Sequence, residues 1–167
     1  RIARTVAQKA TGFGFKVIAY DPYISKVDGK VELVSLDRLL SDSDFISIHA
    51  PLTEETKHAF AEKELKMMKK TAYLINTSRG PLVDEQALYV ALKEGWIAGA
   101  ALDVMEKEPP EWNNPLLALQ NLIVTPHISF YSEESYVELK TKTAEAVLAV
   151  LRGEIPRSVV NPQVLKS

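Results

Sequence analysis

Short apolar runs alternate along this chain with longer segments in which apolar residues recur at helical spacing. The runs predict strands at residues 15–20, 45–49, 72–76, 98–104 and 122–125. The segments between and around them predict helices at residues 1–11, 36–40, 62–69, 85–94 and 132–152. Within the runs the apolar residues are consecutive rather than alternate, which is typical of parallel strands covered by helices on both faces. Strands that alternate with helices indicate βαβ units, so we predict an α/β fold with a doubly wound parallel sheet.

Polar residues and glycine mark several boundaries of these elements. Ser35 and Asp84 are suited to cap two helices, because their side-chain oxygens can accept the free backbone N–H groups of the first turn. Gly153 is expected to end the last helix. Residues 24–31 are predicted to form a polar loop, and the Pro-rich segment 108–115 a long loop inside the same domain.

Composition limits the classes of partner and site. The chain has 167 residues, 46% hydrophobic and 25% charged, with a formal net charge of −2, as expected of one domain with a sizeable core. This charge gives no electrostatic footprint for nucleic acid or an anionic membrane, and no apolar stretch approaches the roughly 20 residues that span a bilayer. We therefore expect neither partner. The absence of Cys excludes thiolate metal sites and fits a reducing cytoplasm, so we expect a cytoplasmic protein without a metal site.

Three segments with chemically useful side chains each follow a predicted strand. Arg79 lies in the segment NTSRG at residues 76–80, Glu108 follows the next strand, and His127 comes directly after Pro126 beyond the last strand. The carboxyl ends of parallel strands meet at one edge of a sheet, where open α/β sheets bind ligands. We therefore expect the three side chains to share one site.

These side chains suit chemistry on an acid that carries a neighbouring carbonyl. A guanidinium is a planar fork that binds a carboxylate through two hydrogen bonds, so Arg79 is expected to hold the substrate and polarise its carbonyl. His127 is expected to be the general acid and base, and a nearby carboxylate favours its protonated form. The alternative for each residue taken alone is an ordinary solvated loop position.

A candidate nucleotide-binding residue, Asp21, stands directly after the strand at residues 15–20. In a dinucleotide-binding fold a carboxylate at this place accepts hydrogen bonds from the adenosine ribose and repels a 2′-phosphate, which favours NAD over NADP. The commoner use of Asp21-Pro22 is a simple turn. The chain contains no G-x-G-x-x-G motif, and Gly12 and Gly14 precede the strand, where they end a helix rather than hold phosphate.

In order, spacing and strand context these residues resemble the D-isomer-specific 2-hydroxyacid dehydrogenases over essentially the whole chain. The residues that carry the resemblance are Asp21, Arg79, Asp103, Glu108 and His127. The segment YSEES at residues 131–135 favours the phosphoglycerate dehydrogenase and C-terminal-binding-protein-like branch. The resemblance implies a Rossmann-type NAD-binding domain and hydride transfer between NAD and a small 2-hydroxy or 2-keto acid.

The resemblance implies catalytic roles for Arg79, Glu108 and His127. It favours Glu108 over the nearby Glu106, because the family's catalytic acid lies five residues after the Asp that ends the strand, as Glu108 does here. The positions that it implies for cofactor binding are Arg1, Ile2, Asp21, Ala50, Pro51, Thr77, Ser78, Arg79, Asp103 and His127.

The two remaining histidines are expected to have other roles. His49 also follows a strand, but in the family this segment borders the adenosine pocket, so His49 is expected to be structural or adjacent to the cofactor. His58 is expected at the surface. Neither is predicted to be the acid and base.

Parts of the family's pattern have no counterpart in these 167 residues. In the family, a substrate domain, a first strand and the leading glycines of the phosphate loop precede the position of Arg1. The backbone N–H groups of Arg1 and Ile2 would face the pyrophosphate at a helix N-terminus. We therefore expect residues 1–167 to be a NAD-binding domain truncated at its N-terminus, with no activity on its own. Either the sheet is disturbed beside residues 15–20, or a strand of another chain fills the gap.

The resemblance also bears on assembly and on an alternative function. It implies a homodimer formed largely through this domain. The alternative to an enzyme is an NAD(H)-sensing scaffold like the C-terminal-binding corepressors, in which the same three catalytic residues occur. No basic patch or regulatory tail is visible in the sequence, which favours the enzyme.

Overall fold

The computed structural model of the protein describes residues 1–27, 29 and 31–166. The chain divides into two compact units, residues 1–127 and residues 128–167. The first unit holds the strands and the three side chains predicted to be catalytic, and the second holds the last helix.

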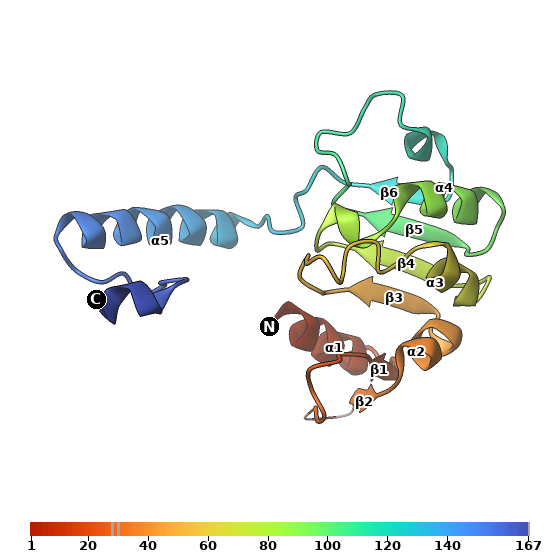
Figure 1. The fold of residues 1–167 in the computed structure, drawn as a ribbon, viewed down its shortest axis with the longest axis horizontal. Coiled ribbons are helices and arrows are strands. Elements are labelled where there is room, and N and C mark those ends of the chain that lie inside the picture. Colours follow the sequence, from red (N-terminus) through yellow and green to blue (C-terminus); the bar gives the residue numbers. More distant parts are fainter. Residues whose placement is uncertain (28, 30, 167) are drawn as a thin grey trace. The chain divides into compact units, whose positions relative to one another are not determined.

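Four parallel strands form the main sheet of the first unit (Figure 1). They are β3 (Phe45–Ile48), β4 (Tyr73–Asn76), β5 (Gly99–Leu102) and β6 (Leu122–Val124), and they lie side by side in this order. Asn76 pairs with Ile48 on one side and with Leu102 on the other. Leu102 in turn pairs with Val124. The four strands therefore end at the same level, as the prediction of a shared carboxyl edge requires.

Three helices lie before and between these strands, and all were predicted from the sequence. α2 (Leu36–Asp42) precedes β3, α3 (Glu62–Met67) connects β3 to β4, and α4 (Glu85–Lys93) connects β4 to β5. Two short 3-10 turns lie in the connections, η1 (Gly80–Leu82) before α4 and η2 (Pro115–Ala118) before β6. Both predicted caps are confirmed. The Ser35 side chain accepts the N–H of Arg38 at the start of α2, and the Asp84 side chain accepts the N–H of Ala87 at the start of α4.

The core lies between one face of this sheet and the helices. Its fully buried side chains include Leu40, Leu65, Leu74, Leu82, Leu88, Ile97 and Leu116. Buried and exposed positions alternate along β3, where Ile46 and Ile48 are buried and Phe45 and Ser47 are exposed. The side chains on one face of the sheet therefore supply the core.

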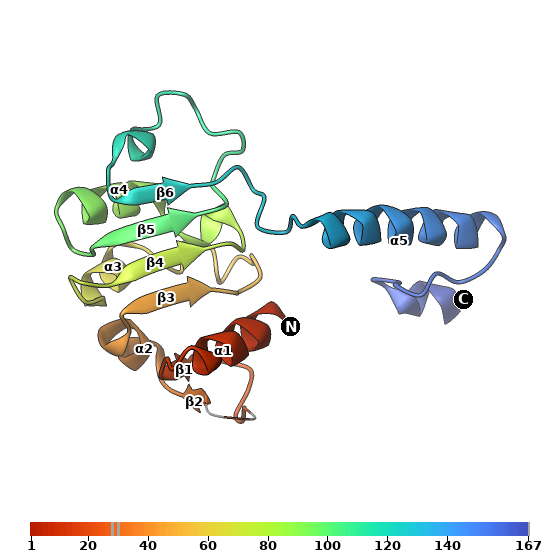
Figure 2. The same ribbon diagram turned by 180° about the vertical axis from the view of Figure 1, so that it is seen from behind.

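The opposite face is open over much of its width within the first unit. Phe45, Tyr73 and Ile123 lie on this face by the register of the strands and are 57%, 45% and 66% exposed. Figures 1 and 2 show α3 and α4 against one face and α1 (Ile2–Gly12) on the other side, next to β1 and β3. Helices therefore lie on both sides of the sheet, as the predicted α/β fold class requires, while α1 leaves the side chains of Tyr73 and Ile123 exposed within the first unit.

The sheet is interrupted beside the strand predicted at residues 15–20. β1 (Val17–Ala19) and β2 (Val31–Leu33) form a separate parallel pair, and within the described residues no ladder joins β1 to β3. Aromatic rings make contact across this interruption: the centroids of Phe15 and Phe45 lie 6.2 Å apart, in an edge-to-face arrangement. The expected disturbance of the sheet is confirmed.

The strand β2 was not predicted. The sequence pattern gave a polar loop at residues 24–31, of which residues 28 and 30 lie outside the described residues. The strand has only three residues, and its central side chain, Glu32, is polar and pairs with Arg38 of α2 at 2.5 Å. So short a strand with a charged centre carries no apolar run to predict it.

The second unit consists mainly of α5 (Glu133–Leu151), followed by the 3-10 turn η3 (Pro162–Lys166). The Ser132 side chain accepts the N–H of Ser135 and begins the helix, and Gly153 follows its end with φ of 75°. The predicted helix is thus confirmed, but its apolar side chains, such as Val137 and Leu151, are exposed. No helix among the described residues combines the length and the apolar character needed to cross a membrane.

Candidate active site

The candidate site is built at the carboxyl edge of β4, β5 and β6. Because these strands end in register, the segments that follow them begin at the same edge. Arg79 follows β4, Glu108 follows β5 and His127 follows β6. The prediction that the three side chains share this edge is confirmed.

His127 and Glu108 are in direct contact. The Nδ1 atom of His127 lies 2.7 Å from Oε2 of Glu108, and both side chains keep more than a third of their surface exposed. The hydrogen bond with His127 is the main reason that the pKa of Glu108 lies below its ordinary value, against the opposing effect of partial burial. An ionised carboxylate only accepts hydrogen bonds, so Nδ1 carries the hydrogen and Nε2 is left to face a ligand.

Glu106, the alternative to Glu108, faces other groups. Its Oε1 atom accepts the backbone N–H of Glu85 at 2.9 Å and lies 3.3 Å from Nε2 of His58. The structure therefore brings Glu108, and not Glu106, to His127. The remaining oxygen of Glu108 accepts the N–H of Met105 at 3.0 Å, which fixes the direction of its carboxylate.

The backbone at His127 is held in an uncommon conformation. Its φ is 53°, in the left-handed region, and its N–H donates to the carbonyl of Thr125 at 3.0 Å across Pro126. Few residues other than glycine adopt this region, although Asn, Asp and His do so more often than most. The turn presents the imidazole to Glu108 at the edge of the sheet.

A buried asparagine shapes the turn that carries Arg79. Asn76 is fully buried at the end of β4, its Nδ2 donates to the carbonyl of Arg79 at 2.8 Å, and its Oδ1 accepts the N–H of Ser78 at 3.0 Å. The Ser78 hydroxyl donates to the carbonyl of Ile48 at 2.7 Å. Sequence reasoning did not single out Asn76 as a site residue. Its signal was a polar residue at the end of an apolar run, since a buried amide needs partners such as these.

The Arg79 side chain itself is exposed, and its Nη1 donates to the carbonyl of Ser78 at 2.6 Å. This bond uses one of five N–H donors of the guanidinium, so the others are free to bind a carboxylate in pairs.

Asp103 lies between the ends of β5 and β6. It is 4% exposed, its Oδ1 accepts the hydroxyl of Thr125 at 2.5 Å, and its N–H donates to the carbonyl of Asn76 at 2.9 Å. These bonds tie the ends of three neighbouring strands together. A contact between Asp103 and the cofactor stays a prediction.

The predicted nucleotide-binding residues lie at the ends of α1, β1 and β3. Asp21 follows β1, and its Oδ1 accepts the N–H of Tyr23 at 2.9 Å, so it also forms the turn that was the alternative interpretation. Arg1 and Ile2 begin α1, whose first turn has no acidic residue and no side-chain cap. The other predicted contacts with cofactor, at Ala50, Pro51, Thr77 and Ser78, follow β3 and β4. All these roles stay predictions.

The other two histidines are held in different surroundings. His49 is half-buried and its Nε2 lies 3.0 Å from the hydroxyl of Ser47. Burial lowers the pKa of His49 below its ordinary value. His58 was expected at the surface, and its side chain keeps 36% of its surface exposed. Its φ is 53°, and its Nδ1 and Nε2 atoms lie near Asp84 and Glu106.

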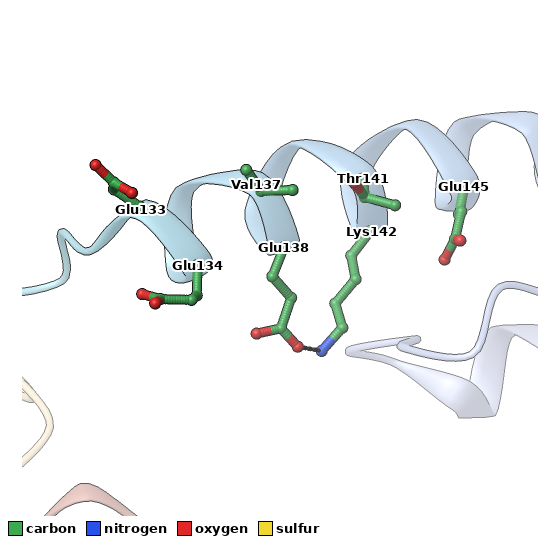
Figure 3. Close-up of a pocket in the computed structure, with 7 residues that line it drawn as sticks. All are labelled: Glu133, Glu134, Val137, Glu138, Thr141, Lys142 and Glu145. Atoms are coloured by element: carbon green, nitrogen blue, oxygen red, sulfur yellow. Dashed lines mark hydrogen bonds and ion pairs between the residues drawn. The ribbon is translucent and has the colours of Figure 1, made fainter.

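A surface hollow lies elsewhere, on α5. It is lined by Glu133, Glu134, Val137, Glu138, Thr141, Lys142 and Glu145, all on one side of this single helix (Figure 3). It contains none of the predicted site residues. A hollow along one helix, without a second wall, has none of the enclosure typical of a binding pocket for a small molecule.

The chain is similar in sequence to a family of known proteins. Residues 1–129 match the sequence profile of the D-isomer specific 2-hydroxyacid dehydrogenase NAD binding domain. The chain is 49% identical over 170 residues to the glyoxylate reductase of Korarchaeum cryptofilum (strain OPF8), an alignment that covers 99% of this chain and 51% of that protein. It is 47% identical over 165 residues to the D-3-phosphoglycerate dehydrogenase of Methanocaldococcus jannaschii, covering 96% of this chain and 31% of that protein.

A solved structure agrees with these relatives. The NAD-complexed D-isomer specific 2-hydroxyacid dehydrogenase from Lactobacillus delbrueckii ssp. bulgaricus superposes with a TM-score of 0.85 at 37% identity, covering 94% of this chain and 52% of that one. The chain thus spans about half the length of the glyoxylate reductase and of this structure.

Proposed function

Because this chain belongs to the D-isomer specific 2-hydroxyacid dehydrogenases and contains their NAD-binding domain, we propose that it serves the NAD-dependent reduction of a small 2-keto acid to a D-2-hydroxy acid, and the reverse oxidation. The observation that carries this proposal is the contact of 2.7 Å between His127 and Glu108, at the sheet edge that also holds Arg79. An imidazole paired with a carboxylate, at a sheet edge that also carries a guanidinium, suits proton transfer to a bound keto acid.

Each side chain has a defined part in this reaction. NADH, when bound, supplies the hydride that the carbonyl carbon receives. Arg79 binds the substrate carboxylate through the guanidinium donors that Ser78 does not use. His127 donates the Nε2 proton to the carbonyl oxygen, while its Nδ1–H stays bonded to Glu108. In the oxidation, His127 takes the hydroxyl proton back.

The groups present in the first unit fit a dinucleotide. The start of α1 offers backbone N–H groups without a competing acidic residue, which suits a pyrophosphate. The carboxylate of Asp21, directly after β1, suits the ribose hydroxyls and opposes a 2′-phosphate. We therefore propose that NAD(H) binds in preference to NADP(H).

That preference is testable at Asp21. Replacing Asp21 by Ala removes both the ribose acceptor and the repulsion of the 2′-phosphate, so the ratio of the two affinities should move toward one. Calorimetric titration of NADH and NADPH into the complete enzyme defined below, as the parent and as the Asp21→Ala variant, measures the ratio. Equal or tighter binding of NADPH by the parent would contradict the proposal.

We propose that catalysis needs polypeptide beyond residues 1–167. Two observations support this: the chain spans about half of the relative it matches at 49% identity, and its sheet is interrupted between β1 and β3. A further strand would satisfy the unpaired backbone groups along that interruption, and a substrate domain would cover the carboxyl edge. The protein that includes both, together with residues 1–167, is called the complete enzyme below.

The test is turnover by the complete enzyme. Glyoxylate is the first substrate to try, because a relative at 49% identity is named glyoxylate reductase, and longer 2-keto acids follow. The loss of NADH absorbance gives kcat and KM. Arg79→Ala should raise KM and lower kcat, and Arg79→Lys should restore only part of the activity, because an ammonium lacks the planar pair of donors. Tight NADH binding without turnover of any 2-keto acid would support the NAD(H)-sensing scaffold instead.

We also propose a homodimer formed through this domain and a cytoplasmic location. The many exposed apolar side chains of α5, including Val147, Val150 and Leu151, support an assembly that covers them. The absence of Cys supports a reducing compartment. Light scattering after size-exclusion chromatography would measure the mass of the complete enzyme, and a monomer would contradict the first of these proposals.

A further inference from the structure

Two glutamates from distant parts of the chain bind each other's backbone. Oε1 of Glu85 accepts the N–H of Glu106 at 2.6 Å, and Oε1 of Glu106 accepts the N–H of Glu85 at 2.9 Å. Glu85 is the first residue of α4, and Glu106 lies in the loop between β5 and Glu108. These two reciprocal bonds are called the glutamate latch.

The latch is supported on both sides. The second oxygen of Glu85 accepts the side-chain N–H of Asn114 at 3.0 Å. The carboxylate of Glu106 lies at the N-terminus of α4, where a negative charge is favoured, and 3.3 Å from Nε2 of His58. Asp84 is 3.9 Å from the other nitrogen of His58. The Glu85 carboxylate therefore has a further hydrogen-bond partner, while the Glu106 carboxylate lies near an imidazole nitrogen that makes no hydrogen bond to any described residue.

The peptide group that the latch holds lies directly against the loop of Arg79. A Cβ atom built on Gly80 would come within 2.0 Å of the carbonyl carbon and oxygen of Met105 and within 2.5 Å of the nitrogen of Glu106. The backbone next to Arg79 therefore packs on the peptide between Met105 and Glu106, with no side chain between them.

The neighbouring peptide group holds the carboxylate predicted to be catalytic. The N–H of Met105 donates to Oε1 of Glu108 at 3.0 Å, while the N–H of the next residue, Glu106, donates to Glu85. Adjacent N–H groups of one short loop thus bind the latch and the partner of His127. A movement of this loop would alter both bonds.

We propose that Glu85 is a positioning residue for the reaction of this site: through the backbone of Met105 and Glu106 it sets the direction of the Glu108 carboxylate and its placement relative to Arg79. The expected effect on catalysis rests on the proposed function, whereas the expected effect of Glu85 on the placement of the Glu108 carboxylate does not. The competing interpretation is that the two glutamates only stabilise the start of α4.

A comparison of variants in the complete enzyme separates the two interpretations. Glu85→Ala removes the acceptor of the Glu106 N–H and leaves the second bond of the latch, whose donor is the backbone N–H of residue 85. Glu85→Gln keeps an acceptor oxygen without the charge. Asp84→Ala is the matched control, because it removes the side-chain cap of the same helix, leaves both bonds between Glu85 and Glu106 in place, and is linked to the loop of residues 105–108 only through His58. The readouts are kcat, KM and the pH–rate profile for 2-keto acid reduction.

Glu85→Ala should lower kcat by about 10- to 100-fold, the size of effect that a small misplacement of a catalytic group produces. The basic limb of its pH–rate profile should move to lower pH, as in an enzyme without the Glu108 charge. Glu85→Gln should recover a large part of kcat. If Glu85→Ala and Asp84→Ala have the same kcat and the same profile, the latch only stabilises the helix and the proposal is wrong.

Amide hydrogen exchange tests the structural part on the 167-residue chain. The informative group is the N–H of Met105, whose acceptor, Glu108, is unchanged in Glu85→Ala. Its protection should fall by roughly tenfold, as expected when a hydrogen bond of ordinary strength is weakened, and should stay at the parent value in Asp84→Ala. Unchanged protection in Glu85→Ala would overturn the proposal. If the complete enzyme reduces no 2-keto acid, the proposed function fails and this exchange measurement alone decides on the latch.

Discussion

At His127 the backbone and the proposed chemistry make opposite demands on the choice of residue. The φ of 53° favours Gly or Asn, whereas proton transfer needs an imidazole. A non-glycine residue in this region costs roughly 1–2 kcal/mol, and an alanine, which has no polar side chain for a local hydrogen bond, is less well suited to it than Asn. An alanine substitution would therefore mix strain with the loss of the acid.

The better test is His127→Asn. Asn accommodates the backbone conformation but cannot donate or accept the catalytic proton, so kcat of the complete enzyme should fall by about 10²- to 10⁴-fold. The melting temperature, followed by circular dichroism, should change little and serves as the control for folding. A kcat within a few fold of the parent would exclude His127 as the acid and base.

Glu108 gives a pH dependence in catalysis. Glu108→Gln removes the negative charge that faces the imidazole at 2.7 Å, so reduction of a 2-keto acid should decline at lower pH than in the parent enzyme. NADH affinity should stay the same. The pH–rate profiles of the two enzymes provide the measurement, and an unshifted basic limb would mean that Glu108 does not tune His127.

Glu108 also gives a pH dependence in stability, and its sign follows from the direction of the shift. The pKa of Glu108 is lowered in the folded chain, chiefly by the hydrogen bond with His127. The contact therefore stabilises the fold above the ordinary Glu pKa of about 4.3 and is lost as pH falls through the lower folded value. Urea unfolding of the parent and of Glu108→Gln should give different free energies of unfolding at about pH 6, and the difference should shrink on acidification. The difference should be small, because both side chains are partly exposed and solvent screens the pair.

At the scale of elements, the backbone of the Arg79 loop packs so closely on the loop of residues 105–108 that no side chain fits between them. A Cβ at Gly80 would lie 2.0 Å from backbone atoms of Met105, and backbone cannot move aside as a flexible side chain would. Gly80→Ala should therefore reduce the free energy of unfolding by roughly 1–3 kcal/mol, the usual cost of overpacking. Gly95→Ala is a matched substitution without neighbours within 4 Å, although its own φ of 68° carries backbone strain. Urea unfolding measures both. A loss no larger at Gly80 than at Gly95 would argue against a rigid contact.

The sequence was most informative about elements with strong local signals. Ser35 and Asp84 mark their helices because capping is a contact between a side chain and the next few backbone groups. The residues at the strand ends, Arg79 and His127, were found because a parallel topology sends strand ends to one edge. Glu108 was separated from Glu106 only by family resemblance, since both follow the same strand.

The remaining features depend on contacts that sequence spacing does not record. The latch joins residues 21 positions apart through backbone N–H groups, which every residue except proline carries. The placement of His58 near Asp84 and Glu106 depends on a positive φ and on the packing of other segments. The exposure of Tyr73 and Ile123 depends on which segments pack against that face of the sheet, and an apolar run in the sequence does not show whether its face is covered.

On the scale of the whole molecule, the interruption between β1 and β3 separates a four-stranded sheet, which we expect to be more stable, from a two-stranded pair, which we expect to be less stable. The strands β4 and β5 have neighbours on both sides, whereas β1 and β2 form an isolated pair of three-residue strands. Amide hydrogen exchange on the 167-residue chain should therefore be slowest at residues 73–76 and 99–102 and much faster at 17–19 and 31–33. In the complete enzyme the protection of 17–19 should rise toward that of β4. Equal protection of all six strands in the isolated chain would contradict the division.

The same interruption has a consequence for anyone who handles this chain in solution. The free edge of β3 presents unpaired N–H and C=O groups along the uncharged sequence Phe45-Ile46-Ser47-Ile48, beside exposed aromatic rings. Proteins usually guard such an edge with lysine, proline or a bulge, and none of these lies within β3. Concentrated solutions of residues 1–167 are therefore prone to edge-to-edge aggregation. A charged substitution at Ser47, on the open face, is the first change to make if the chain is to stay dispersed.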